Sequence, residues 1–174
     1  MKIKYNEIFK QLLSTYNLPD DLVFAVDLPL EVQEVLNDSI VITEFGITLK
    51  SFNRLYKATE DWENQSIIED NENHFHVDWF IDPADSKKSF MLGVKTLILL
   101  ADKFQKEKFE GVRFRYSFQT PELGQLFDAK NNLDSIGDEY FISDRLSFHK
   151  LRDGENIIST NEENQFWALM IIDI

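Results

Sequence analysis

The sequence predicts an α+β fold, in which two to four helices pack on an antiparallel β-sheet that ends in a C-terminal β-meander. Three observations predict it: apolar residues at helical spacing lie toward the front of the chain, alternating segments lie behind them, and the turn signal Asp153-Gly154 follows. With 174 residues, 43% of them hydrophobic, the chain is long enough to form a stable core without disulfides or structural metal ions. We therefore expect a single globular domain over residues 1–174.

Helices are expected where apolar residues recur every three or four positions. These segments are residues 5–16, 29–38, 86–110 and, more briefly, 123–129. Pro19 ends the first, because proline disfavours helix at the residue before it. Asp85 or Ser86 is suited to cap the long third helix, and Gly111 to stop it.

Strands are expected where β-branched residues gather or where apolar and polar residues alternate. These segments are residues 39–45, 47–52, 74–82, 112–119, 146–152, 157–158 and 166–172. Gly46 is expected to turn between the first two, and Asp153-Gly154 to form a hairpin between residues 146–152 and the strand that begins at Ile157.

The charge restricts the choice of partner. The net charge of −13 creates a field that repels phosphate backbones and anionic lipids, which argues against nucleic-acid and membrane binding. The same field favours a basic protein partner.

The compartment is predicted from what the chain lacks. It has no cysteine, which excludes disulfides, thiolate zinc sites and cysteine nucleophiles and fits a reducing compartment. Its first residues are polar, whereas a signal peptide needs an apolar stretch of about 7–15 residues. We therefore expect a soluble, cytoplasmic protein.

Common catalytic motifs are also missing from the sequence. It contains no Gly-x-Ser-x-Gly nucleophile turn, and its six glycines are scattered rather than gathered in a phosphate-binding loop. These absences disfavour serine hydrolases and nucleotide-binding enzymes.

One local pattern suits a metal ion: His74-x-His76-x-Asp78. Residues two apart on a strand share a face, so these side chains would line up, and His149 lies on another expected strand. Imidazoles with a carboxylate suit Zn²⁺ with an open coordination position, so a zinc-dependent hydrolase is the alternative function. Alternation on a half-exposed strand also places polar residues on one face without any function, and this interpretation is favoured.

Two further sets of charged residues are candidates for a function. Asp78 and Asp82 flank Trp79 and Phe80, where apolar surface would raise a carboxyl pKa, but a structural role for Asp82 at the start of the next helix is the favoured interpretation. Arg113 and Arg115 form a basic stripe whose interleaved aromatics point to the other face, so we expect these arginines to pair with the protein's own carboxylates.

The most polar part of the chain, residues 59–73, is expected to be an exposed loop or a short solvated helix. It carries acids around one tryptophan and no base, a combination that suits docking onto a basic cleft. A solvated loop whose Trp62 folds back onto the core is the alternative, and it is the favoured interpretation of this segment. The expected partner-binding residues are Glu60, Asp61, Trp62, Glu63, Glu69, Asp70 and Glu72.

In size, acidity and lack of catalytic motifs, the whole chain resembles bacterial immunity proteins, which protect cells from cognate toxins. The resemblance implies a non-enzymatic protein whose acidic face sits over the basic active site of a nuclease-like toxin. Binding and neutralisation of a toxin is therefore the leading expectation.

Overall fold

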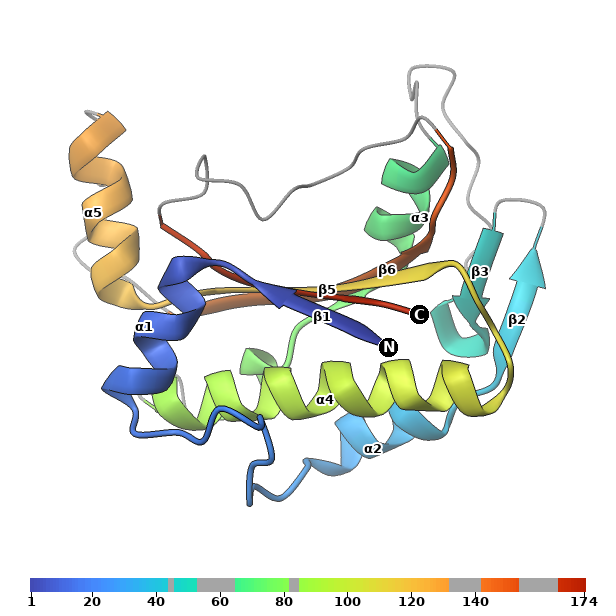
Figure 1. Cartoon of the computed structure of the whole chain (residues 1–174), viewed down its shortest axis with the longest axis horizontal. Coiled ribbons are helices and arrows are strands. Elements are labelled where there is room, and N and C mark those ends of the chain that lie inside the picture. The colour runs from blue at the N-terminus through green and yellow to red at the C-terminus, as the bar shows by residue number, and fades with distance from the viewer. Residues whose placement is uncertain (44–45, 53–64, 82–84, 132–141, 154–165) are drawn as a thin grey trace.

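The computed structural model of the chain describes residues 1–43, 46–52, 65–81, 85–131, 142–153 and 166–174. Within these residues it confirms the α+β fold: a five-stranded antiparallel sheet has the order β1-β7-β5-β6-β4, and β2 pairs with β3 in a second sheet (Figure 1). The strands are β1 (Lys2–Tyr5), β2 (Ile40–Thr43), β3 (Gly46–Leu49), β4 (His74–Phe75), β5 (Val112–Gln119), β6 (Ser143–Lys150) and β7 (Ala168–Asp173). The α-helices are α1 (Glu7–Thr15), α2 (Leu30–Asn37), α3 (Gln65–Glu72), α4 (Ser86–Lys106) and α5 (Pro121–Asn131), and two short 3₁₀ helices are η1 (Lys50–Phe52) and η2 (Asp78–Phe80).

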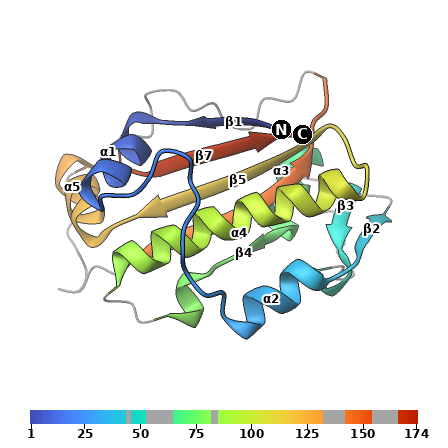
Figure 2. The ribbon, with the colours of Figure 1, turned by 60° about the horizontal axis from the view of Figure 1, so that its bottom comes forward.

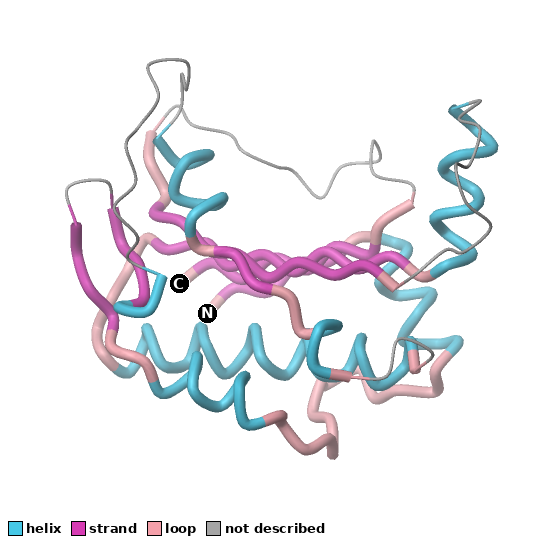
Figure 3. Tube along the Cα trace, turned by 180° about the vertical axis from the view of Figure 1, so that it is seen from behind, coloured by secondary structure: helices cyan, strands magenta, loops and turns pink. Residues whose placement is uncertain are grey.

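The helices divide between the two faces of the large sheet. α4 runs along one face with α1 and α2 on the same side, whereas α3 and α5 lie on the opposite side (Figures 1 and 3). None of the helices in the described part of the chain is long and apolar enough to cross a membrane.

The core lies between α4 and the sheet and is built from aromatic rings. Phe104 of α4 meets the rings of Phe114 and Phe148 edge-on, at 5.1 Å between centroids in both cases. Phe90, nearer the start of α4, packs edge-on against Phe118, with 5.4 Å between the ring centroids. All five residues are fully buried, so this aromatic layer fixes the position of α4 on the strands.

The C-terminal strands lie in a different order from their order in the chain. β5 pairs with β6 along its whole length, from Val112 opposite Lys150 to Gln119 opposite Ser143. β7 pairs with the other edge of β5, and β1 then closes that side of the sheet (Figure 2). The strand expected at residues 157–158 lies outside the described residues.

The first strand was not predicted, and Asn6 explains how it is held. The Asn6 side chain caps α1 by accepting a hydrogen bond from the backbone of Phe9 at 3.0 Å. The same side chain accepts a bond from the Leu169 backbone at 3.0 Å and donates one to the Trp167 carbonyl at 2.7 Å. One residue thus starts α1 and ties it to the beginning of β7, which brings β1 alongside.

Candidate functional site at the β4 edge

The segment from His74 to Phe80 leaves the sheet after two residues. β4 covers only His74 and Phe75, and Val77 takes a helical conformation at φ −89° and ψ −20° that leads into η2. The prediction of a continuous strand over residues 74–82 is therefore wrong. Phe75 and Val77 are buried in the core, and this burial bends the backbone inward at the edge of the sheet.

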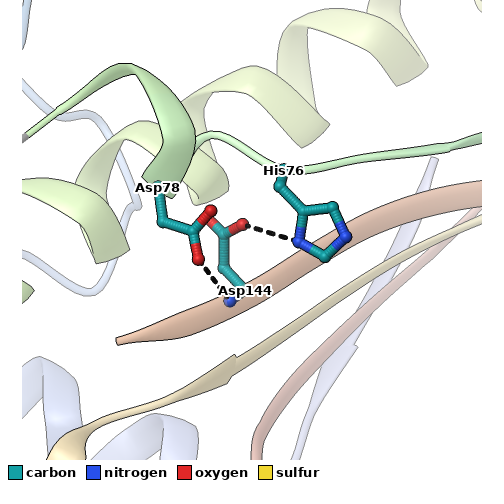
Figure 4. A group of neighbouring side chains, drawn as sticks. All are labelled: His76, Asp78 and Asp144. Atoms are coloured by element: carbon teal, nitrogen blue, oxygen red, sulfur yellow. Dashed lines mark hydrogen bonds and ion pairs between the residues drawn. The ribbon is translucent and has the colours of Figure 1, made fainter. Parts of the chain in front are cut away.

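This bend brings His76 and Asp78 to Asp144 of β6, a residue far away in the sequence (Figure 4). His76 Nδ1 lies 3.7 Å from Asp144 Oδ1. The Val77 amide donates a hydrogen bond to Asp144 Oδ1 at 3.1 Å, and the Asp144 amide donates one to Asp78 Oδ2 at 3.2 Å. Each of the three side chains offers one ligand atom, and these atoms lie within 4.8 Å of one another.

Burial shapes the electrostatics of this cluster. Asp144 is 0% exposed, and this burial, together with the charge of Asp78, raises the pKa of Asp144 to about 8. Burial also raises the pKa of Asp78 and lowers the pKa of His76. All three shifts oppose ionisation, because charge is costly at this depth without a compensating partner.

The four-residue zinc site predicted from the sequence is not formed. His149 is buried elsewhere, with its Nδ1 3.4 Å from Asp70 Oδ1, and it lies outside the cluster at the β4 edge. His74 is exposed and its Nδ1 contacts the backbone oxygen of Asn71. His76 and Asp78 do come together, but their third neighbour is Asp144, which no local sequence pattern marks.

The prediction that Glu69 and Asp70 lie on an exposed acidic surface is wrong. Each is only 4% exposed, because α3 turns both toward β6 and the β2–β3 sheet. Glu69 accepts hydrogen bonds from the Ile47 and Lys150 amides and from Arg152 at 2.8 Å. Glu72 is half-buried, and Glu60, Asp61, Trp62 and Glu63 lie outside the described residues.

Asp70 is the centre of a buried ionic network between α3 and the sheet. It pairs with Arg115 at 2.9 Å and Arg145 at 3.1 Å, and it accepts a hydrogen bond from Ser147 at 2.7 Å. Burial opposes the charge of Asp70, but the His149 ring, the two guanidinium groups and Ser147 outweigh it and lower the pKa of Asp70.

The expectation that Arg113 and Arg115 pair with the protein's own carboxylates is confirmed. Arg113 binds Asp173 through two parallel hydrogen bonds, at 2.7 and 2.9 Å, and Arg115 binds Asp70. Both guanidinium groups therefore have carboxylate partners within the fold.

Two aromatic side chains of η2 reach solvent above the cluster. Trp79 is 70% exposed and Phe80 is 38% exposed. α2 lies on the same side of the large sheet as α4, toward the β4 edge (Figures 1 and 2). Its outward face carries Leu30, Glu31 and Glu34, all exposed. We call these five residues the α2–η2 surface.

Comparisons of the chain with protein-family models, curated proteins and solved structures found no match. The candidate site therefore stands on its own geometry.

Proposed function

We propose that the protein is a non-enzymatic binding protein that docks onto a basic protein partner, of the kind a toxin presents, and neutralises it. The observation that supports this proposal is the α2–η2 surface, to which η2 contributes exposed aromatic side chains and α2 contributes exposed carboxylates. This surface replaces residues 60–72 as the proposed partner-binding region.

The carboxylates of this surface have no nearby cation in the sequence. Between Lys10 and Lys50 the chain contains neither lysine nor arginine. Five acids of this stretch are exposed in the structure: Asp20, Asp21, Asp27, Glu31 and Glu34. In space, Lys95 of α4 lies near Asp27 and donates a hydrogen bond to the Val26 carbonyl, so the surface is predominantly rather than wholly acidic. A predominantly acidic surface accelerates encounter with a basic partner and disfavours acidic ones.

Trp79 is the residue of this surface expected to contribute most of the binding energy. Binding energy at interfaces concentrates in a few residues, among which tryptophan is enriched, and charged neighbours add rate and specificity. Val23 and Leu30 add exposed apolar area at 73% and 66% exposure within the acidic stretch. The combination suits a surface that covers and blocks a basic cleft.

The proposal is tested by identifying and reconstituting the partner. The full chain is used to capture proteins from cells that make it naturally, and any captured protein encoded next to its gene is purified and tested for toxicity. We expect a basic protein that binds one-to-one and whose toxicity is abolished by co-expression. A partner that stays toxic in the presence of the bound chain would refute neutralisation.

Charge reversal then tests the surface. Glu31→Lys with Glu34→Lys is expected to slow association and to weaken its dependence on salt. Glu122→Lys with Asp128→Lys, on α5, makes the same charge change on the opposite side of the sheet. Equal effects of the two pairs would show that only net charge matters and would reject the α2–η2 surface.

A further inference from the structure

We propose that His76, Asp78 and Asp144 form a binding site for a divalent transition-metal ion such as Zn²⁺ or Mn²⁺. The site does not depend on the proposed partner binding, and it differs from the four-residue set that the sequence pattern predicted.

The three ligands come from two segments far apart in the sequence and lie close together in the fold. His76 follows β4, Asp78 begins η2, and Asp144 lies in β6. Their ligand atoms lie within 4.8 Å of one another, with His76 Nδ1 3.7 Å from Asp144 Oδ1. A metal ion about 2.0–2.2 Å from each ligand requires only a small inward rotation of these side chains.

Unpartnered oxygen atoms point to a missing positive charge. Asp144 Oδ2 and Asp78 Oδ1 are both buried and have no hydrogen-bond partner. In the part of the chain that the structure describes, neither carboxylate forms an ion pair with a lysine or arginine. Buried carboxylate oxygens normally have partners, so two such atoms in one cluster need a proton or a cation between them.

The remaining contacts orient the ligands as an outer shell does in metal sites. The Val77 amide fixes one oxygen of Asp144, and the Asp144 amide fixes one oxygen of Asp78, which leaves the other oxygen of each free. The Trp79 ring stacks on His76 and holds the imidazole from the solvent side. Such second-shell support sets the direction of first-shell ligands.

The ligand chemistry selects the class of ion. One imidazole nitrogen and two carboxylate oxygens suit Zn²⁺ or Mn²⁺ better than Cu⁺, which prefers sulfur, and better than Ca²⁺, which prefers an all-oxygen shell. A bound ion would also link η2 to β6, so that metal binding would stabilise the fold and fix Trp79 in place.

The test uses the full chain without a histidine tag, stripped of metal with EDTA. Calorimetric titration with Zn²⁺ and with Mn²⁺ measures stoichiometry and affinity, and thermal unfolding measures stabilisation. We expect one-to-one binding with a rise in Tm for at least one of the two ions. Asp144→Asn and His76→Ala are each expected to weaken that binding by at least about tenfold, since even outer-shell changes cost about 10–100-fold.

Matched controls separate this site from weak surface binding. His74→Ala removes a neighbouring exposed histidine, and Asp102→Asn removes a carboxylate from α4; both should leave one-to-one binding unchanged. Asn is nearly the same shape as Asp, and circular dichroism checks that Asp144→Asn is folded. Asp78→Asn serves as a second ligand variant if Asp144→Asn unfolds. No one-to-one binding, or binding that survives Asp144→Asn and Asp78→Asn, would overturn the proposal.

Discussion

The indole of Trp79 stacks on the imidazole of His76, with ring centroids 4.6 Å apart and 21° between the ring planes. One face of the indole is thus held by the fold while the rest stays open to solvent. A tryptophan fixed in one orientation loses little conformational entropy when it enters a partner's pocket, so it binds more tightly than a freely rotating one. The stack therefore joins the proposed metal ligand and the proposed docking surface in a single local structure.

Replacement of Trp79 by alanine is expected to weaken partner binding by at least about 30-fold, equivalent to about 2 kcal/mol, the threshold for an interface hot spot. The fold should be unaffected, because 70% of the side chain is exposed. Surface plasmon resonance with the captured partner measures the loss, and thermal unfolding checks stability.

Leu126→Ala is the control for this prediction. Leu126 is a comparably exposed apolar residue, at 58%, but it lies on α5 at a distance from η2 (Figure 1). We expect the partner affinity of Leu126→Ala to match that of the wild type. The docking assignment would be rejected by an equal loss in both variants, or by no loss in Trp79→Ala.

The Asp70 network is expected to be essential for stability. Asp70→Asn leaves the guanidinium groups of Arg115 and Arg145 in the network without their carboxylate partner. Removing one partner of a buried ion pair costs about 3–5 kcal/mol, so we expect a loss of this size in the unfolding free energy. Chemical denaturation of Asp70→Asn and wild type measures it. Glu7→Gln removes the exposed Glu7–Lys10 pair and should cost nothing measurable. A small effect of Asp70→Asn would mean that α3 is held mainly by its apolar contacts.

The same network gives a pH dependence whose sign follows from the pKa of Asp70. Burial alone would raise the pKa of Asp70, but His149, Arg115, Ser147 and Arg145 together favour the charged form and hold the folded-state pKa below the ordinary value of 3.8. The stabilisation is therefore complete above about pH 5 and is lost as the pH falls below about 4, through the folded-state pKa.

Denaturation of wild type and Asp70→Asn at a series of pH values measures the contribution of the Asp70 charge to the free energy of unfolding. The difference in unfolding free energy between the two proteins should be large at neutral pH and should shrink in acid. A difference that is constant with pH would show that the Asp70 charge does not contribute to it.

The regular elements were predictable because their signals are local. The alternation from Val112 to Gln119 gives β5 with its observed bounds, and Asp85 caps α4 through a hydrogen bond from the Lys88 amide at 2.9 Å. Helices and strands with a continuous apolar face are determined by spacing within the segment itself. The pairing of Arg113 and Arg115 with carboxylates followed from the same alternation.

The site was not predictable, because its parts meet only through tertiary pairing. Asp78 and Asp144 lie 66 residues apart, and residue 144 precedes the strand expected over residues 146–152, in a segment to which no element was assigned. A signal was present: Asp144 occupies an inward position of β6, in line with Leu146 and Phe148, and an inward carboxylate on a strand is unusual. Glu69 and Asp70 were misinterpreted for the converse reason, since their cationic partners come from β5, β6 and the residues after β6.

A final prediction concerns the contact between Gly93 of α4 and Tyr116 of β5. Glycine inside a helix costs about 1 kcal/mol relative to alanine, so its presence needs a structural reason. A Cβ atom at position 93 would overlap the ring of Tyr116, which is fully buried and donates a hydrogen bond to the Ser89 carbonyl. The glycine therefore allows α4 to lie close to the sheet.

Gly93→Ala is expected to destabilise the protein by about 1–3 kcal/mol despite its better helix propensity, because the ring or the helix must shift. Tyr116→Leu removes the overlapping ring and is destabilising on its own, since it leaves a cavity. In the double variant the new methyl group has room, so its loss of stability should be smaller than the sum of the two single losses by about 0.5–3 kcal/mol. Additive losses in denaturant titrations would contradict this, because they would mean that residues 93 and 116 do not press on each other.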